Sequence, residues 1–233
     1  MIDPKSAMRA RIRAARDAFI GAMELDGSPS RLREGQHQSP SRRREGLGEG
    51  LSASTDAVGI QHPLPRPLPQ AGGETIAPPP AYLARLTPGT IVASYIPLGS
   101  EADPTALVAA ALTNGCTLAL PHVISRQAPM RFLEWNPARP LERGIYGLQQ
   151  PPADARELAP DIVLVPLVAF DSALHRLGQG AGYYDRALAS LPAAWRLGVA
   201  WSVQQVSQVP VDPWDVPLHG VVTERSVKFA GDS

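Results

Sequence analysis

The chain has 233 residues, which suits one α/β domain with a sizeable core or two small ones. It carries 22 Lys and Arg against 22 Asp and Glu, and this zero formal net charge disfavours a general nucleic-acid-binding protein, which usually has a basic excess. The single cysteine, Cys116, excludes an intrachain disulfide and a multi-cysteine metal site, and its apolar neighbours in the sequence indicate a small buried core residue.

Residues 4–26 form the first predicted element, a helix, with Pro4 suited to its first turn. Its cations recur at three- and four-residue spacing and form one basic stripe, made of Lys5, Arg9, Arg13 and Arg16. A neighbouring apolar stripe would pack on the core. The segment lacks the apolar centre of a secretory signal, and no run in the chain approaches the roughly 20 apolar residues of a membrane helix. We therefore expect a cytoplasmic protein that does not bind membranes. We also expect a monomer.

Residues 27–76 are a low-complexity segment. The pattern Ser-Pro-Ser-Arg at 28–31 returns at 39–42, and every second residue from 63 to 69 is proline. Such a segment cannot bury enough apolar surface to offset its ordering entropy. We therefore expect a disordered insertion within a single α/β domain formed by residues 1–26 and 77–233. The alternative is an arginine-rich tail for nucleic acid or a partner, but acidic residues and prolines dilute its basic character.

Beyond residue 77, strand-like and helix-like segments alternate, which indicates an α/β fold with a mostly parallel sheet. The predicted helices cover 80–86, 103–113 and 182–191, and the predicted strands cover 90–95, 116–121, 130–135, 161–166, 195–200 and 221–222. Asp103 is the expected cap of its helix, with Pro104 in the first position. The strand at 161–166 is apolar enough to be central in the sheet. Ligands of such sheets bind at the carboxyl ends of strands, here residues 95–101, 121–122, 166–182 and 201–204.

The stretch from Arg176 to Arg186 combines three alternating glycines with two tyrosines and an aspartate. Glycines between a strand and a helix let the backbone approach a ligand and offer several N–H groups to one anion, so this stretch predicts a phosphate site. It is neither a Walker loop nor the usual dinucleotide fingerprint, because the residues that complete those motifs are absent. Arg176 can supply charge to a phosphate, and Asp185 can hold Mg²⁺ or be only a helix-start acid.

Residues 165–171, Val-Pro-Leu-Val-Ala-Phe-Asp, and 176–185, Arg-Leu-Gly-Gln-Gly-Ala-Gly-Tyr-Tyr-Asp, resemble the signature of the 5-formyltetrahydrofolate cyclo-ligase family, also called 5,10-methenyltetrahydrofolate synthetases. Further segments resemble the family in order: Lys5-x-x-x-Arg9, 95–105 with a central Glu101, 120–123, 130–132, 144–151, 198–204 and 221–224. The resemblance covers nearly everything except 27–76. It implies a three-layer α/β fold similar to that of NagB, RpiA and the CoA transferases.

The resemblance also implies an activity. Enzymes of this family convert 5-formyltetrahydrofolate and ATP to 5,10-methenyltetrahydrofolate, ADP and phosphate, with Mg²⁺, and the folate can carry further glutamates. Transfer of the γ-phosphoryl group to the formyl oxygen turns a poor leaving group into a good one, and attack by N10 then closes the ring. The task of such a protein is mostly positioning and charge stabilisation.

The family's site residues carry over onto matching positions of this chain. The implied catalytic residues are Arg176, Glu101 and Lys5. The implied contacts to ATP are Lys5, Arg9, Arg176, Gly178, Gly180, Gly182, Tyr183 and Trp201. Glu101 and Tyr184 would contact the folate, and Tyr184 and Trp201 would supply aromatic walls for pterin or adenine. Asp185 is the first choice as a Mg²⁺ ligand and Asp171 the second. His122, His175 and His219 form no metal cluster by spacing and are interpreted as structural.

Two positions inside the glycine stretch depart from the family pattern. Gln179 stands where an aromatic or basic residue is common, and Ala181 stands where glycine or lysine is common. These departures are the support for an alternative, a non-catalytic member that binds folate or a phosphorylated ligand. A sugar-phosphate isomerase-like enzyme is a third hypothesis, but it rests on α/β topology alone, and a fold does not determine a function.

Overall fold

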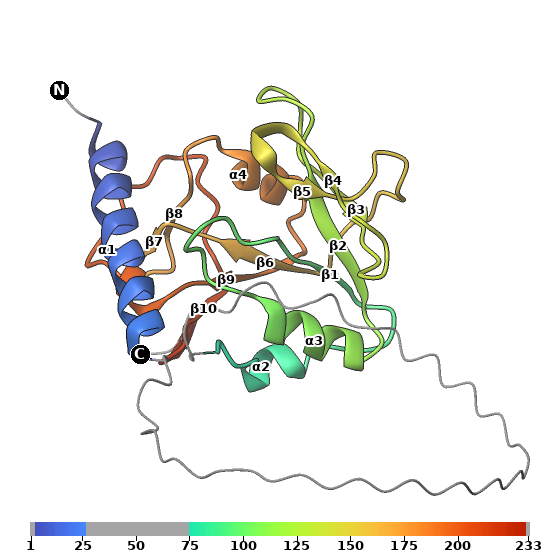
Figure 1. The fold of residues 1–233 in the computed structure, drawn as a ribbon, viewed down its shortest axis with the longest axis horizontal. Helices are drawn as coiled ribbons and strands as arrows, with labels where there is room; N and C mark the ends of the chain where they lie inside the picture. The colour runs from blue at the N-terminus through green and yellow to red at the C-terminus, as the bar shows by residue number, and fades with distance from the viewer. Residues whose placement is uncertain (1–2, 27–74, 232–233) are drawn as a thin grey trace, which may run out of the picture.

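The computed structural model of the chain describes residues 3–26 and 75–231. Within these residues the core is one seven-stranded sheet, whose strands in spatial order are β11 (Val227–Phe229), β10 (Gly220–Val222), β9 (Trp195–Val199), β6 (Ile162–Pro166), β1 (Ile91–Ala93), β2 (Thr117–His122) and β3 (Arg131–Glu134) (Figure 1). The five inner strands are parallel, and the two edge strands are antiparallel to their neighbours. The predicted mostly parallel sheet with β6 at its centre is confirmed.

Helices cover both faces of the sheet. Helices α2 (Pro80–Leu83) and α3 (Thr105–Thr113) lie on one face, and α4 (Tyr183–Ala189) lies on the other. Side chains of the inner strands alternate between the two cores, as the two-residue period of a strand requires. On β6, Ile162 and Leu164 join the cluster under α2 and α3, whereas Val163 and Val165 join the cluster under α4. This arrangement gives the three layers of the predicted fold.

Helix α1 (Pro4–Asp26) lies along one end of the sheet, where it attaches to two separate parts of the chain. Ile12 packs in a small cluster with Leu177 and Val209, and Ile20 packs in the core under α2 and α3. Between them, the buried Arg16 donates from Nε to Ser100 Oγ at 2.9 Å. The apolar stripe predicted for this helix is made of Met8, Ile12, Ala15 and Phe19. Ile12 is buried, and Met8 and Phe19 pack partly buried against the two clusters, so this stripe faces the core.

Shorter elements complete the fold and were not predicted. The hairpin of β7 (Ala169–Phe170) and β8 (Arg176–Leu177) interrupts the predicted run from the central strand to the glycine stretch. A second hairpin joins β4 (Glu142–Arg143) to β5 (Gln149–Gln150), with the 3-10 turn η1 (Ile145–Gly147) between them. Another 3-10 turn, η2 (Ser202–Gln204), contacts α1. Strands of two residues carry too little periodicity to be recognised in a sequence.

Several boundaries differ from the prediction by one to three residues, and two of the differences have a clear physical reason. Helix α3 begins at Thr105 rather than Asp103, because the Asp103 carboxylate accepts hydrogen bonds from the Thr105 backbone N–H at 2.9 Å and the Thr105 hydroxyl at 2.5 Å in a local turn. Ile76, which was assigned to the end of the predicted insertion, is only 1% exposed and packs in the core with Tyr82. The remainder of that predicted insertion, 27–74, lies outside the described residues.

Among the helices that the structure describes, none combines the length and the apolar character needed to cross a membrane.

Gly198 lies where β9 passes between tightly packed aliphatic side chains. A Cβ at this position would lie 2.7 Å from Leu218 Cδ1, 2.9 Å from Leu167 Cδ2 and 3.1 Å from Val221 Cγ2. Because buried side chains must move to make room, Gly198→Ala is expected to lower the free energy of unfolding by about 1–3 kcal/mol. Urea unfolding followed by circular dichroism measures the change.

Gly21 on α1 provides the matched control. A Cβ there would meet nothing within 4 Å. Since Ala is favoured over Gly inside a helix, Gly21→Ala is expected to raise the free energy of unfolding by up to about 1 kcal/mol. Equal stability of Gly198→Ala and the wild type would contradict the packing around β9.

Candidate active site

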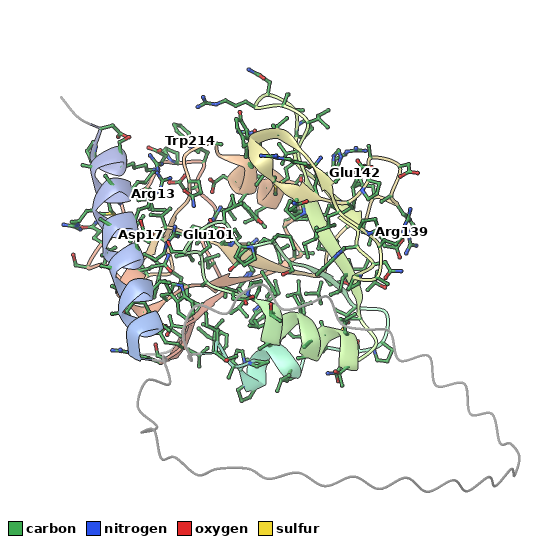
Figure 2. All side chains as sticks on the ribbon, in the orientation of Figure 1. Arg13, Asp17, Glu101, Arg139, Glu142 and Trp214 are labelled. Atoms are coloured by element: carbon green, nitrogen blue, oxygen red, sulfur yellow. The ribbon has the colours of Figure 1, made fainter. Side chains whose placement is uncertain are left out.

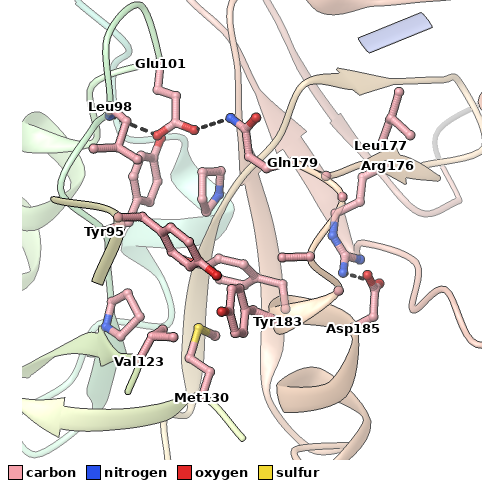
Figure 3. A pocket seen from close by; sticks show the side chains of 18 of the residues that line it. Tyr95, Leu98, Glu101, Val123, Met130, Arg176, Leu177, Gln179, Tyr183 and Asp185 are labelled. Atoms are coloured by element: carbon pink, nitrogen blue, oxygen red, sulfur yellow. Dashed lines mark hydrogen bonds and ion pairs between the residues drawn. The ribbon is translucent and has the colours of Figure 1, made fainter. Parts of the chain in front are cut away.

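A cavity of about 560 Å³ opens at the carboxyl ends of β1, β2 and β6. We call it the main pocket. Its walls come from α1, from the turn that follows β1, from η1, from the glycine loop at 178–182, and from a loop at 212–215. Figure 3 shows Glu101 from the turn after β1, Gln179 from the glycine loop and Tyr183 from α4 around one space. The pocket lies where ligands of parallel sheets bind.

Most of the predicted site residues line the main pocket: Lys5, Arg9, Glu101, Arg176, Gly178, Gly180, Gly182, Tyr183, Tyr184 and Asp185. They come from both ends of the chain, so the fold brings together residues that are separated by more than 170 positions in the sequence. Trp201 and Asp171 are the two predicted site residues that do not line it.

The structure does not place Trp201 in the pocket wall, where it was predicted. Its side chain is buried in the core under α1, where its ring centroid lies 5.9 Å from that of Phe19. Its indole N–H donates to the Ser100 carbonyl at 3.1 Å, which satisfies the only polar group of the ring. An aromatic residue at a strand end can turn to either side, and here it turns into the core. Trp201 therefore stabilises the turn that holds Glu101 instead of forming a wall of the pocket.

Asp171 is not available as the Mg²⁺ ligand that was predicted, because its carboxylate is buried and accepts hydrogen bonds from the backbone. Oδ1 accepts hydrogen bonds from the N–H groups of Ala173 and His175, both at 3.0 Å, and Oδ2 accepts from the Val209 N–H at 3.0 Å and faces His175 Nδ1 at 3.2 Å. Burial alone would raise the pKa of Asp171, but these hydrogen bonds outweigh it and hold the pKa below its usual value. The carboxylate stabilises the turn between β7 and β8 and has no oxygen left for Mg²⁺.

Lys5 lies at one end of the main pocket between two carboxylates that the sequence analysis missed as site residues. Its Nζ lies 2.6 Å from Asp212 Oδ2 and 2.7 Å from Asp215 Oδ2. Burial opposes the charge on Lys5, but the hydrogen bonds to both aspartates raise its pKa above the usual value. Burial likewise opposes the charge on Asp215, and Lys5 nevertheless lowers the pKa of this carboxyl. Lys5 and Asp215 are therefore both charged at neutral pH.

Arg176 lies deeper in the same wall, with its guanidinium almost fully buried. Its Nη2 lies 2.5 Å from Asp185 Oδ1, and its Nη1 donates to the Val216 carbonyl. Burial lowers the pKa of Arg176, whereas Asp185 and Asp215 favour its charged form. Asp185 and Asp215 thus both interact electrostatically with one buried guanidinium, and both line the main pocket.

The glycine loop lies against α1 and needs glycine for two reasons. Gly180 and Gly182 adopt positive φ angles of 106° and 66°, which other residues rarely adopt. A Cβ at Gly180 would also lie 3.3 Å from Arg9 Cζ, so the guanidinium lies directly over the loop. Arg9 Nε donates to the Gly178 carbonyl at 3.0 Å and fixes this approach. The glycines therefore allow the close approach between the loop and Arg9 at the edge of the main pocket.

Glu101 is buried beside the mouth of the pocket and is held by the chain itself. Oε2 accepts from the Leu98 N–H at 3.0 Å, and Oε1 accepts from Gln179 Nε2 at 2.7 Å (Figure 3). The other end of the same amide, Gln179 Oε1, accepts from Arg13 Nη2. Figure 2 shows Arg13 on the side of α1 that faces Glu101. Gln179, a departure from the family pattern, therefore links Glu101 to Arg13 through its neutral amide.

The tyrosines of the pocket differ in how their hydroxyl groups are satisfied. Tyr95 donates to the Ala102 carbonyl at 2.5 Å, and Tyr183 donates to the Ser125 carbonyl at 3.2 Å. The Tyr184 hydroxyl is buried and has no hydrogen-bond partner among the described residues. Burial and the charge of Glu101 raise the pKa of Tyr184, so the hydroxyl keeps its proton and remains a donor. A buried donor without a partner is costly, and a polar group of a ligand would satisfy it.

Two aromatic residues at the rim of the main pocket were not predicted. Tyr146 is 70% exposed and has a positive φ of 56°, and Trp214 is 69% exposed between Asp212 and Asp215. Exposed aromatic residues at the mouth of a cavity are typical of binding surfaces. Only the exposure distinguishes them from core residues, and exposure cannot be read from a single sequence.

The main pocket offers carboxylate oxygens and positively charged side chains to a ligand. Among the described residues, no three His, Cys, Asp or Glu side chains gather as a metal cluster. His175 faces Asp171, and His219 contacts Arg196, so two of the three predicted structural histidines have protein partners outside the main pocket. His122 is buried on β2.

Comparisons with known proteins agree on one family. Residues 70–224 match the model of the 5-formyltetrahydrofolate cyclo-ligase family. The 5-formyltetrahydrofolate cyclo-ligase of Escherichia coli K12 is 32% identical over 170 residues, which cover 68% of this chain and 88% of that protein. The enzyme of the same name from Mycolicibacterium smegmatis is 34% identical over 145 residues, covering 59% of this chain and 75% of that protein.

A solved structure resembles the fold as well. The NMR structure of Aquifex aeolicus 5,10-methenyltetrahydrofolate synthetase is 32% identical, has a TM-score of 0.54, and covers 66% of this chain and 76% of that chain. The family resemblance and the three-layer α/β fold predicted from the sequence are therefore confirmed.

The buried Asp171 carboxylate yields a prediction about stability. Asp171→Asn is expected to lower the free energy of unfolding by about 1–3 kcal/mol at neutral pH, because charge-assisted hydrogen bonds are lost. The native pKa lies below 3.8, the value for the unperturbed group. The contribution of the carboxylate is therefore complete above that value and is lost as the pH falls through the native pKa.

Urea unfolding at neutral pH and below about pH 4 measures this dependence. The difference in stability between the wild type and Asp171→Asn should shrink at acidic pH. Asp154→Asn is the control, because Asp154 is exposed. A difference that stays constant with pH would contradict the role assigned to Asp171.

Proposed function

This chain belongs to the 5-formyltetrahydrofolate cyclo-ligase family, and we propose that it converts 5-formyltetrahydrofolate to 5,10-methenyltetrahydrofolate with ATP, releasing ADP and phosphate. The observation that carries the proposal is the division of the main pocket into two halves. We call the part lined by Lys5, Arg9 and Arg176 the cationic half, and the part lined by Glu101 and the tyrosines the other half. Figure 3 shows Glu101 and the Arg176–Asp185 pair on different sides of the space. A cationic half suits a triphosphate, and an acidic, aromatic half suits a pterin ring.

The reaction needs both ligands in one cavity. The formyl oxygen attacks the γ-phosphorus of ATP, the bond to the bridging oxygen breaks, and ADP leaves. The N10 nitrogen then attacks the activated formyl carbon, the carbon–oxygen bond breaks, phosphate leaves, and the N10 proton is lost. Phosphoryl transfer of this kind depends on positioning and on charges that stabilise the transferred group.

The cationic half would hold the triphosphate. Lys5 and Arg9 lie one turn apart on α1, and both line the pocket beside the glycine loop. Lys5 is held between Asp212 and Asp215, so its charge is already positioned before a nucleotide arrives. Arg176 is fixed by Asp185 in the wall behind. Cations that need no rearrangement stabilise developing charge more effectively than mobile ones do.

The family's use of Mg²⁺ is compatible with the carboxylates of this half. Mg²⁺ keeps several waters and binds through one or two carboxylates together with substrate phosphates, so it needs no cluster of three protein ligands. Asp185 and Asp215 both line the pocket, and both interact with the buried Arg176. We infer that these two residues would hold the ion. A bound Mg²⁺ would neutralise charge on the phosphoryl oxygens.

The other half would hold the folate. Glu101 is a buried acceptor at the mouth, and the Tyr184 hydroxyl is a buried donor without a partner among the described residues. A pterin ring presents both donors and acceptors on its edge, so it can satisfy both residues. Gln179 Nε2 donates to Glu101 and would have to yield to a donor on the ring. Tyr183 extends the aromatic wall.

One coupled assay tests the activity. The protein is mixed with 5-formyltetrahydrofolate, with and without ATP and Mg²⁺, and the absorbance of the methenyl product is followed. The proposal expects product only when ATP is present. Folate binding without turnover would favour a non-catalytic member of the family instead, and ATP-independent turnover of a sugar phosphate would favour an isomerase.

Lys5 is predicted to be essential for turnover. Lys5→Ala is expected to lower kcat/KM roughly 100-fold or more, because a fixed charge is lost where the phosphoryl group is transferred. The fold should survive, since α1 is also attached through Ile12 and Ile20. Lys228→Ala removes the same charge from the edge strand β11 and serves as the control. Full activity of Lys5→Ala would refute this role.

Glu101 is predicted to act mainly on the folate. Glu101→Gln is expected to raise the KM for 5-formyltetrahydrofolate about tenfold and to change the KM for ATP much less, because a charged acceptor becomes a neutral one. Initial rates with each substrate varied in turn separate the two constants. Glu134→Gln, on the edge strand β3, is the control. An unchanged KM for the folate would remove Glu101 from the substrate site.

A further inference from the structure

A second cavity, of about 510 Å³, lies on the outer side of the glycine loop. We call it the outer cavity. It is lined by Ser6, Arg9, Ala10, Arg13, Arg126, Tyr146, Gln179, Gly180 and Ala181. It shares Arg9, Tyr146 and the loop residues 179–181 with the main pocket, so the loop separates two connected spaces. Arg13 and Arg126 line only the outer one.

The charge in the outer cavity is unbalanced. Among the described residues, its wall contains three guanidinium groups, from Arg9, Arg13 and Arg126, and no carboxylate. The main pocket differs, because Lys5 faces Asp212 and Asp215 there, and Arg176 faces Asp185. Like charges around one concave surface raise the local potential and concentrate anions.

The partners of the three arginines do not neutralise them. Arg13 donates to the neutral Gln179 amide, and Arg9 donates to the Gly178 carbonyl. The nearest carboxylate to Arg9 is that of the exposed Asp3, 4.0 Å from Nη1. Among the described residues, neither Arg13 nor Arg126 forms an ion pair.

The backbone adds further donors to the same wall. In the part of the chain that the structure describes, the N–H groups of Gly180 and Ala181 donate to no protein acceptor. Gly180 has a positive φ of 106°, so the loop is not in a conformation that would pair these groups within a helix or strand. Successive free N–H groups in a turn favour an anion.

We propose that the outer cavity is a second anion site, which binds a phosphate oxyanion between Arg13 and Arg126. Arg13 comes from α1 and Arg126 from the loop after β2, and each guanidinium group can donate two hydrogen bonds to one phosphate. Two sources share this chemistry. The anion is either a phosphate group of a nucleotide that extends past the glycine loop, or inorganic phosphate. The site follows from charge and geometry and does not require the proposed activity.

The first test is titration of the protein with inorganic phosphate at low ionic strength, followed by calorimetry. The double variant Arg13→Gln/Arg126→Gln is expected to weaken phosphate binding about tenfold or more, because charge-assisted hydrogen bonds are lost. The control is Arg11→Gln/Arg225→Gln, which removes the same charge from exposed residues that line neither cavity. It should change the dissociation constant less than about twofold, since distant exposed charges are screened.

A third variant locates the bound phosphate. Lys5 lines only the main pocket, so Lys5→Ala should retain the phosphate-binding event that the double variant weakens, even if binding in the main pocket changes. Loss of binding in Lys5→Ala with retention in the double variant would overturn the proposal, because the anion would then occupy the main pocket. Equal weakening in the double variant and its charge-matched control would also overturn it. So would a wild-type protein that binds no phosphate.

Titration with ATP distinguishes the two sources. If the site holds a phosphate of the nucleotide, the double variant should bind ATP about tenfold more weakly, and ATP should displace phosphate. If the site holds inorganic phosphate, ATP affinity should stay the same and only phosphate affinity should fall. Either result supports the site. Because binding is measured without turnover, absence of cyclo-ligase activity would count against the proposed function and not against the outer cavity.

Discussion

Helix α1 brings Lys5 and Arg9 to the main pocket and Arg13 to the outer cavity. The other walls of both come from residues beyond position 90, so the packing of this helix determines whether the site forms. The attachment has an apolar part and a polar part. Ile12 and Ile20 pack into two hydrophobic clusters of the core. Arg16 donates to Ser100 in the turn that carries Glu101. Side-chain burial of this size contributes a few kcal/mol. The cations of the helix are therefore positioned by packing that lies outside the pocket.

The same attachment links the two halves of the main pocket. Ser100 also donates to Asp17 on α1, and the Ser100 carbonyl accepts from the buried Trp201. The turn with Glu101 is thus held from two sides, by the helix and by the core. A shift of α1 would move the cationic residues and the acidic residue together. Such coupling suits a site in which two ligands must meet, because small errors of position reduce reaction rates strongly.

Local patterns predicted the parts of the site that depend on neighbours in the sequence. The glycine loop and the apolar strand β6 are of this kind. Alternating glycines indicate positive φ angles, and a short apolar run indicates a buried strand, so a few neighbouring residues suffice to predict each. Asp171 and Trp201 could not be assigned correctly, because the direction of a side chain depends on a hairpin and a core that form elsewhere. Asp212 was missed for a related reason, since its partner Lys5 lies 207 residues away.

Gln179 illustrates why a departure from a family pattern has to be judged in three dimensions. In the sequence it is only a residue that replaces an aromatic or basic one. In the structure its amide lies between the buried Glu101 and Arg13, and it borders both cavities. A cation at 179 would pair with Glu101 and repel Arg13, and a carboxylate would do the reverse. A neutral amide serves as donor to Glu101 and acceptor to Arg13, so it hydrogen-bonds both residues and repels neither.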